Sequence, residues 1–308
     1  MKRLTFVLGI AAAFALVLYA GWRLHRWRQA EAEVLLRKTH TLDGVVKRYP
    51  DFQSKILGQE RRVWVYLPPV YWDEPTGSFP VLYMLDGQNV FDGATAFIAG
   101  KEWEVDETAE RLIGEGRIEP LIVVAVDNGG AARADEYLPS VRRGTGGQVD
   151  RFARVLVEEV KPWVDANFRT RTGREDTGIA GSSFGSVAAL WIGLTHADVF
   201  GKIAAVSTSA TWDDDQIVRF VAALPGKPET MVWTDMGTAE GPGHVEGARR
   251  LRDALVAKGW EEGRDLAYVE AEGEPHDEVA WAKRVPGILE FLFPPRPETS
   301  ETPVAVDG

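Results

Sequence analysis

Short apolar runs alternate with helix-compatible segments along most of this 308-residue chain, and this alternation limits the possible fold more than any other feature. The runs are only a few residues long and lie at 62–67, 80–85, 121–126, 179–180, 203–207, 231–234 and 266–269. The amphipathic segments lie near 103–114, 149–168, 184–196, 245–258 and 278–292. Strands that are apolar throughout, with helices between them, are typical of a mostly parallel sheet with helices on both faces. We therefore expect an α/β fold.

The composition excludes several classes of function. Hydrophobic residues make up 45% of the chain and charged residues 26%, which is ordinary for a globular protein with a substantial core. The length is enough for one large α/β domain or two small ones. The net charge is −11 and no basic run follows the N-terminus, so we expect no nucleic acid as a partner. The absence of cysteine excludes disulfides, thiolate metal sites and cysteine nucleophiles.

The first residues of the chain differ from the rest and predict an attachment to a membrane. A basic start at residues 1–3 is followed by an almost entirely apolar run over residues 4–20. This run is near the lower limit of roughly 17–25 residues for a membrane-spanning helix. We expect residues 1–28 to be a signal anchor that holds an exported domain at the membrane. A cleaved signal peptide, which would make the domain secreted or periplasmic, is the alternative.

Two further boundaries follow from the composition. Residues 29–55 are largely polar, so we interpret them as a lead-in to the first core strand rather than as part of the sheet. After residue 295 the chain turns to proline, glutamate, threonine and serine, which is typical of disorder. The prediction is a folded domain over residues 29–295 and a disordered tail over residues 296–308.

The most informative motif is Gly-x-Ser-x-Gly at residues 181–185, between an apolar run and a helix-compatible segment. A turn of this kind exposes a serine hydroxyl at the top of a sheet, where a base can activate it as a nucleophile. The two glycines frame Ser183, although Ser182 is an alternative, and we expect them to permit a strained and closely packed turn. Because the motif also occurs by chance, and serine is a common helix N-cap, neighbouring strand ends have to supply the other catalytic groups.

Two strand ends supply a base and an acid, because catalytic groups gather at the carboxyl ends of strands in α/β sheets. His276 lies between the last apolar run and the last amphipathic segment, which makes it the preferred base, and His244 is the second choice. Glu240 and Asp235 both follow the run at 231–234. A carboxylate there would accept the imidazole N–H and stabilise the imidazolium. We prefer Glu240, because it lies farther into the loop and reaches His276 more easily.

An oxyanion hole requires two backbone N–H groups that point at the developing negative charge. The N–H of Phe184, the residue after Ser183, is one expected donor. The loop Asp86–Asn89 follows an early apolar run, and Gln88 within this loop is the expected second donor.

These residues resemble those of the Putative esterase family of the α/β-hydrolase superfamily. The family includes esterase D-like enzymes, enterochelin (siderophore) esterases, feruloyl and acetyl-xylan esterases and mycolyltransferases. The matching segments lie in order over roughly residues 55–293, at 65–69 with Tyr71, 81–92, 136–139, 181–185, 237–241 and 276–278 with Trp281. Two positions depart from the pattern, since Ser186 stands where the family usually has glycine and Leu138 where threonine is common.

The resemblance implies an α/β-hydrolase fold and a complete catalytic set. The implied nucleophile, base and acid are Ser183, His276 and Glu240, and the implied oxyanion hole is formed by the backbone N–H groups of Gln88 and Phe184. Ser183, Glu240 and His276 also follow the chain order of α/β hydrolases.

The predicted function is hydrolysis of a carboxylic ester through an acyl-enzyme on Ser183, for which neither a metal nor an organic cofactor is needed. The expected partner is a small-molecule ester, such as an acylated sugar, a feruloyl ester or a siderophore-type ester. Acyl transfer to a sugar or alcohol by the same residues is one alternative. An inactive binding protein on the same fold is another, against which the intact set of serine, histidine and acid argues.

Overall fold

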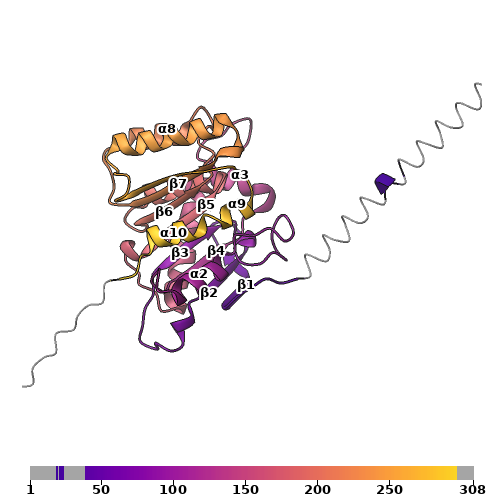
Figure 1. Cartoon of the computed structure of the whole chain (residues 1–308), viewed down its shortest axis with the longest axis vertical. Coiled ribbons are helices and arrows are strands. Elements are labelled where there is room, and N and C mark those ends of the chain that lie inside the picture. Colours follow the sequence, from indigo (N-terminus) through magenta and orange to yellow (C-terminus); the bar gives the residue numbers. More distant parts are fainter. Residues whose placement is uncertain (1–18, 20, 24–38, 297–308) are drawn as a thin grey trace, which may run out of the picture.

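A computed structural model describes residues 19, 21–23 and 39–296 of the chain, and its centre is an eight-stranded sheet (Figure 1). The strands are β1 (Val45–Ser54), β2 (Gln59–Leu67), β3 (Val81–Leu85), β4 (Ile122–Val126), β5 (Thr177–Ser182), β6 (Lys202–Val206), β7 (Met231–Gly237) and β8 (Leu266–Ala271). Their spatial order is β1-β2-β4-β3-β5-β6-β7-β8. Pairing is antiparallel between β1 and β2 and between β2 and β4, and parallel between all other neighbours. The predicted α/β-hydrolase fold with a mostly parallel sheet is confirmed.

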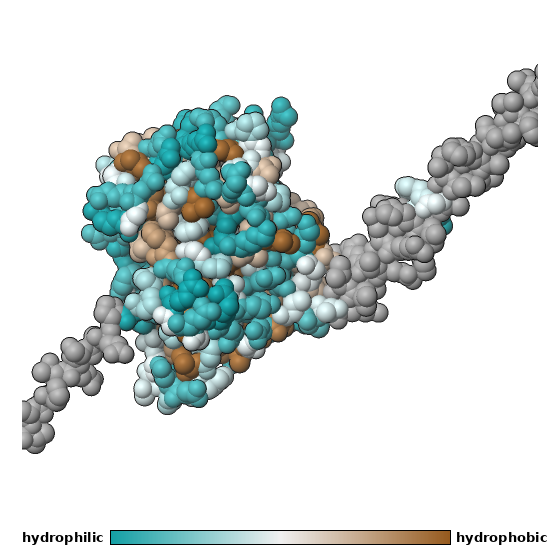
Figure 2. All heavy atoms as spheres, viewed as in Figure 1, coloured by the Kyte–Doolittle hydropathy of each residue, from teal (hydrophilic) through white to brown (hydrophobic). Residues whose placement is uncertain are grey.

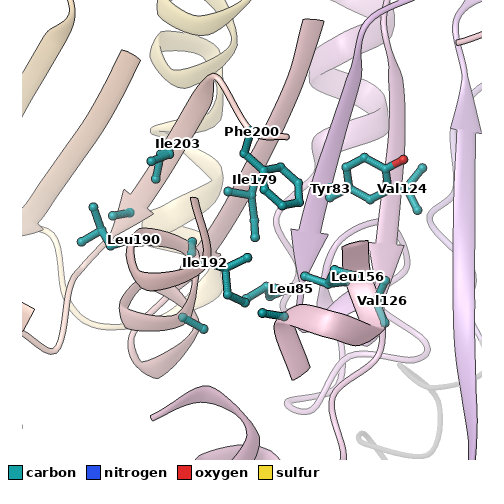
Figure 3. Packing of buried hydrophobic residues seen from close by; sticks show 14 of the residues in the cluster. Tyr83, Leu85, Val124, Val126, Leu156, Ile179, Leu190, Ile192, Phe200 and Ile203 are labelled. Carbon is teal, nitrogen blue, oxygen red and sulfur yellow. The ribbon is translucent and has the colours of Figure 1, made fainter. Parts of the chain in front are cut away.

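Each face of the sheet packs against its own set of helices, because successive strand residues point to opposite sides. In β3, Leu82 and Met84 belong to one apolar layer. Tyr83 and Leu85 belong to the other, part of which Figure 3 shows. The helices of the first layer are α2 (Val105–Gly114), α9 (Glu278–Ala282) and α10 (Val285–Leu292). Those of the second are α3 (Arg133–Tyr137), α4 (Val149–Arg154), α5 (Lys161–Asn167), α6 (Phe184–Thr195), α7 (Gln216–Ala223) and α8 (Pro242–Lys258).

The interpretation of residues 29–55 as a lead-in was wrong for its second half, because β1 occupies Val45–Ser54 at the edge of the sheet. Most side chains of β1 are exposed or half-buried, so the strand has no apolar run that would reveal it. It also contains Pro50, which has no N–H to donate to a neighbouring strand. The register shift between Tyr49 and Phe52 accommodates this proline, as expected of an edge strand with a bulge.

The last amphipathic segment, predicted near 278–292, is two helices rather than one. Helix α9 ends at Ala282 and α10 begins at Val285. Pro286 in the first turn of α10 explains the break, because proline cannot donate to the preceding turn and is tolerated at a helix start. The break places Arg284 between the helices, where its side chain is buried. The short helices α3 and α7 were not predicted.

The predicted terminal segments lie mostly outside the described residues. Of the predicted signal anchor, residues 1–28, only residues 19 and 21–23 are described, and of the predicted tail, residues 296–308, only residue 296. Within the described part of the chain, no helix has the length and apolar character needed to cross a bilayer. Export and the domain boundaries therefore stay predictions. The folded part shows a mostly hydrophilic face with small, separate groups of apolar residues (Figure 2).

Candidate active site

Ser183 lies on a sharp turn between β5 and α6, as the Gly-x-Ser-x-Gly motif predicts. Its backbone has φ 57° and ψ −120°, a strained conformation that residues other than glycine rarely adopt. Its N–H donates to the carbonyl of Val206 in the neighbouring strand β6, over 3.0 Å, which holds the turn against the sheet. The strain therefore lies at the serine itself and directs its side chain away from the strand and the helix.

The two glycines of the motif serve close packing rather than an unusual backbone angle. A Cβ atom at Gly181 would lie 2.5 Å from the carbonyl oxygen of Gly185, which no side chain can tolerate. A Cβ atom at Gly185 would lie 3.2 Å from Asp86 Oδ2. Neither glycine has a positive φ angle. The motif thus requires glycine because strand, turn and helix approach one another so closely.

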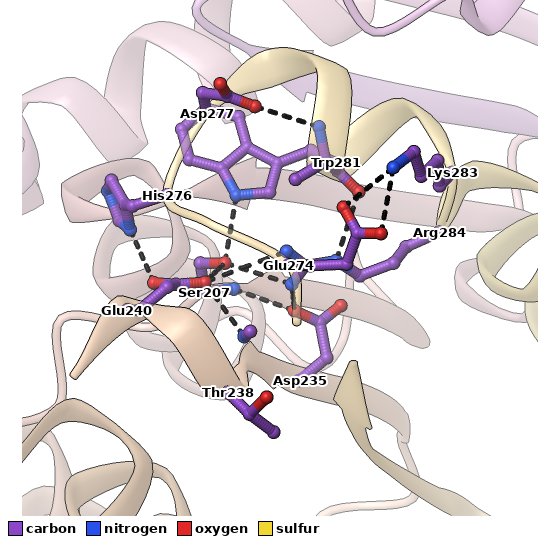
Figure 4. Close-up of polar contacts among 12 residues, drawn as sticks. Ser207, Asp235, Thr238, Glu240, Glu274, His276, Asp277, Trp281, Lys283 and Arg284 are labelled. Atoms are coloured by element: carbon purple, nitrogen blue, oxygen red, sulfur yellow. Dashed lines mark hydrogen bonds and ion pairs between the residues drawn. The ribbon is translucent and has the colours of Figure 1, made fainter. Parts of the chain in front are cut away.

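His276 and Glu240 are hydrogen-bonded to each other at the carboxyl ends of β8 and β7. His276 Nδ1 lies 2.6 Å from Glu240 Oε2 (Figure 4). The Glu240 side chain is only 1% exposed, whereas that of His276 is 42% exposed. The imidazole also packs edge-to-face on Trp281, with ring centroids 5.1 Å apart. His244, the second choice for the base, is exposed in the first turn of α8 and does not line the cavity that contains Ser183.

A buried polar network fixes the second oxygen of Glu240 (Figure 4). Glu240 Oε1 accepts hydrogen bonds from Ser207 Oγ at 2.5 Å and from the N–H of Gly237 at 2.8 Å. Ser207 Oγ in turn accepts from Trp281 Nε1 at 2.9 Å and from Arg284 Nη1 at 3.0 Å. Ser207 is the first residue after β6, and its hydroxyl therefore links Glu240 to Trp281 of helix α9 and to the buried Arg284.

Asp235, the alternative acid, lies in the same network but does not contact His276. Its carboxylate accepts from the indole N–H of Trp233 at 2.7 Å and from the N–H of Ser207 at 2.9 Å, and it forms an ion pair with Arg284. Asp235 is fully buried. Of the two candidate acids, Glu240 contacts His276, whereas Asp235 contacts Trp233, Ser207 and Arg284.

The pKa values of the two acids shift in opposite directions. Burial alone would raise the pKa of Glu240, but the hydrogen bonds from His276, Ser207 and Gly237 outweigh it and hold the pKa below the ordinary value. Burial raises the pKa of Asp235, and the Arg284 guanidinium offsets only part of this effect. Glu240 is therefore ionised at neutral pH, as an acceptor for an imidazole N–H has to be.

The two expected oxyanion donors stand at neighbouring strand ends. Gln88 lies in a 3₁₀ turn, Gly87–Asn89, directly after β3, and Phe184 is the first residue of α6. The first N–H groups of a helix have no partner within the helix, so that of Phe184 can point at a ligand. The carbonyl of Gln88 accepts from Thr95 Oγ1 at 2.9 Å, which fixes the orientation of its backbone.

Ser183, His276 and Gln88 line one cavity of about 350 Å³. The remaining lining residues are Asp86, Asn89, Phe97, Asn128, Gly130, Arg133, Ser182, Glu278 and Trp281. Ser183 Oγ lies 3.5 Å from Ser209 Oγ, and the hydrogen bonds of the described residues do not include one from Ser183 to His276. Catalytic hydrogen bonds are often long before substrate binds, so a nucleophile and base that line the same cavity can still meet in the complex.

Several polar residues of the site were missed by sequence reasoning. Ser207 lies at a strand end, and this position is the signal that indicated Glu240 and His276. It was missed because it was interpreted as the last residue of an apolar run. Arg133 donates two hydrogen bonds of 2.7 Å to Asp86 at the edge of the cavity. No local pattern distinguishes Arg133 or Arg284 from surface arginines, because their partners lie far away in the sequence.

The fold and this site together define the class of the protein. A mostly parallel sheet of this strand order, with a serine on a strained turn and a histidine–carboxylate pair at later strand ends, is that of the α/β hydrolases. The chain belongs to the Putative esterase family, whose model matches residues 54–292. Membership of this family makes it a carboxylic ester hydrolase by class.

Similar proteins are found among sequences and among solved structures. The YbbA protein of Bacillus subtilis is 23% identical over 248 residues, which are 76% of this chain and 92% of that protein. The endo-1,4-beta-xylanase/feruloyl esterase of Xylanibacter ruminicola is 27% identical over 247 residues, 79% of this chain but only 30% of the larger protein.

Two solved structures share the fold. A ferulic acid esterase has a TM-score of 0.65 at 20% identity and covers 81% of this chain and 98% of its own. The enterobactin esterase of Shigella flexneri has a TM-score of 0.66 at 20% identity, over 82% of this chain and 59% of its own. At such identity these likenesses show the fold alone.

Removal of the Ser207 hydroxyl should destabilise the fold in a pH-dependent way. Because the folded pKa of Glu240 is depressed below 4.5, hydrogen bonds to its carboxylate stabilise the fold above that pH and are lost as pH falls through the folded pKa. We expect Ser207→Ala to lower the free energy of unfolding at pH 7 by about 1.5–3 kcal/mol, and by less on acidification. Urea denaturation at pH 7 and at acid pH measures the difference.

The matched control for that measurement is Ser209→Ala, which removes a hydroxyl next to Ser183 that Glu240 does not contact. Its effect on the free energy of unfolding should not change with pH over the same range. Equal pH dependence of the two variants would contradict a role of Ser207 in holding the Glu240 carboxylate.

Proposed function

We propose that this protein is a serine esterase in which Ser183 is the nucleophile, His276 the general base and Glu240 the acid that orients it. The observation that carries the proposal is the buried carboxylate of Glu240. One of its oxygens is held by Ser207 and Gly237, and the other lies 2.6 Å from His276 Nδ1. A carboxylate fixed in this way accepts a proton-bearing nitrogen in one orientation only, which supports a catalytic role for the imidazole.

The tautomer of a neutral His276 imidazole follows from its partner. An ionised carboxylate can only accept hydrogen bonds, so the nitrogen next to Glu240, Nδ1, carries the proton. The other nitrogen, Nε2, is then unprotonated and can accept a proton from a serine hydroxyl. His276 and Ser183 line the same cavity, which supports this pairing.

The reaction then proceeds in two halves. Ser183 Oγ attacks the carbonyl carbon of the ester while its proton passes to His276 Nε2, and the N–H groups of Gln88 and Phe184 stabilise the negative oxygen. The bond to the alcohol breaks, and the alcohol leaves with the proton from His276. Water then attacks the acyl-enzyme, gives its proton to His276, and releases the carboxylic acid as the proton returns to Ser183 Oγ.

Water rather than a second alcohol is the proposed acceptor, because the base is open to solvent. The His276 side chain is 42% exposed, whereas acyl transfer requires that water be kept from the acyl-enzyme. This exposure favours hydrolysis over the acyltransferase alternative.

The proposed substrates are esters with a compact acyl group that carries both an aromatic ring and hydroxyls. The cavity volume of about 350 Å³ is at the small end for ligand sites. Phe97 and Trp281 offer aromatic surfaces, and the side-chain amides of Asn89 and Asn128, which donate to Glu278 and Asp86, each keep a second N–H for a ligand. Feruloyl and N-(dihydroxybenzoyl)seryl groups have this chemistry, and the feruloyl and enterobactin esterases named above are similar proteins.

The nucleophile is tested by Ser183→Ala, with the adjacent Ser182→Ala as a matched control. We expect Ser183→Ala to lower kcat/KM for p-nitrophenyl acetate by at least about a thousandfold and to abolish labelling by a fluorophosphonate probe. Ser182→Ala should keep both activity and labelling. Labelling retained in Ser183→Ala and lost in Ser182→Ala would show that Ser182, and not Ser183, is the nucleophile.

The acyl preference is tested by a comparison of three esters of the same alcohol under the same conditions, namely p-nitrophenyl ferulate, p-nitrophenyl acetate and p-nitrophenyl decanoate. We expect kcat/KM to be lowest for the decanoate by at least about tenfold, since a long chain exceeds the cavity. Asn128→Leu should lower kcat/KM for p-nitrophenyl ferulate more than for the acetate, because it removes the amide whose second N–H can bind an oxygen of the feruloyl group. A preference for the decanoate would contradict the proposed substrate class.

A further inference from the structure

A group of three carboxylates, two of them on buried residues, lies at the start of α2, outside the lining of the catalytic cavity. Glu102, Asp106 and Glu107 each offer one ligand oxygen, and these oxygens lie within 4.8 Å of one another. The exposed fraction is 6% for Glu102 and 0% for Asp106. Carboxylates this close repel one another, and burial removes the water that would screen them. Such a group requires either protons or a cation between the oxygens.

One oxygen of each carboxylate is buried and receives no hydrogen bond from a donor outside the cluster, although a proton shared between Asp106 and Glu107 would join these two side chains. These oxygens are Glu102 Oε2, Asp106 Oδ1 and Glu107 Oε2. By contrast, Glu102 Oε1 accepts from the N–H of Gly93 at 2.9 Å, and Asp106 Oδ2 accepts from the N–H of Asp43 at 2.8 Å. Buried polar atoms without a donor are rare in folded proteins, so three in one cluster point to a cation or to shared protons between them.

Among the described residues, no lysine or arginine forms an ion pair with these carboxylates. The neighbouring cations are engaged elsewhere, with Lys101 on Asp277 at 2.8 Å and Arg111 on Glu115 at 3.6 Å. The positive charge that this cluster requires is therefore not supplied by lysine or arginine within the described part of the chain.

We propose that Glu102, Asp106 and Glu107 bind a calcium ion. Calcium takes oxygen ligands at about 2.3–2.6 Å, so oxygens on opposite sides of the ion lie up to about 5 Å apart, which accommodates the observed 4.8 Å limit. Magnesium, with ligands at about 2.0–2.1 Å, demands near-ideal octahedral geometry, which three carboxylates on one short stretch of chain meet less easily. Water completes the coordination and enters from the surface groove that Glu104, Glu107 and Thr108 line.

The ion would join the cavity wall to the body of the domain. Glu102 ends the segment 91–102, which follows the oxyanion loop and includes Phe97 of the cavity lining. Within this segment, the N–H of Phe97 donates to Asn89 Oδ1 at 2.8 Å. Asp106 and Glu107 belong to α2, which packs against the sheet. A calcium ion between them stabilises the segment against the helix, so its first effect is on thermal stability.

The test is a metal titration of the full chain after treatment with EDTA and dialysis. We expect calcium to raise Tm by on the order of 5 °C at a hundredfold excess over Kd. Terbium should bind in its place and luminesce on tryptophan excitation, because the buried Trp103 adjoins Glu102, and calcium should displace it. Magnesium should raise Tm less than calcium does.

The variant Glu107→Gln should lose both the calcium-dependent rise in Tm and the terbium luminescence. The control Glu246→Gln removes a carboxylate from the exposed side of α8 and should retain both. A wild-type chain that shows neither a rise in Tm nor calcium-displaceable luminescence would overturn the proposal, and the carboxylates would then share protons. Unchanged calcium binding in Glu107→Gln would overturn the assignment of the site, and both results are independent of esterase activity.

Discussion

The buried ion pair between Arg284 and Asp235 is the contact on which the candidate active site depends. Both side chains are almost inaccessible, at 5% and 0% exposure, and both also bind Ser207, Asp235 through the N–H and Arg284 through the hydroxyl oxygen. Loss of one partner from such a pair costs about 3–5 kcal/mol, because the other charge stays buried without compensation. Because Asp235 holds the N–H of Ser207 and Arg284 holds its hydroxyl oxygen, the hydroxyl has one direction in which to donate. Glu240 Oε1 lies in that direction, 2.5 Å from Ser207 Oγ.

This arrangement connects the fold to the chemistry through the ends of neighbouring strands. Ser207 follows β6, Asp235 and Glu240 belong to β7 and the turn after it, and His276 follows β8. Arg284, at the break between α9 and α10, also contacts Ser207. Trp281 of α9 contacts both Ser207 and His276. The base is exposed and the acid is buried, so the core fixes the orientation of an imidazole that substrate and water can still reach.

The sequence predicted those parts of the molecule that local patterns specify. The buried strands are apolar along their whole length, and the turn at Ser183 has to carry glycine on both sides, so both were visible without the structure. Strand β1 was missed because its edge position leaves it polar and its bulge contains Pro50. Ser207 and Arg284 were missed because their roles depend on contacts between residues 77 positions apart, which no local pattern records. The preference for Glu240 over Asp235 as the acid rested only on its position in the loop. In the structure, the contact of Glu240 with His276 distinguishes the two residues.

A double-mutant cycle of Ser207→Ala and Glu240→Gln on kcat/KM tests this account most directly. The account predicts that Ser207 acts through Glu240, so Ser207→Ala should lower kcat/KM strongly in the wild-type background and only slightly in the Glu240→Gln background. The coupling should exceed about 1 kcal/mol, with folding of each variant checked by circular dichroism. Effects that add without coupling would show that Ser207 does not position the acid, and would contradict the link between the buried ion pair and catalysis.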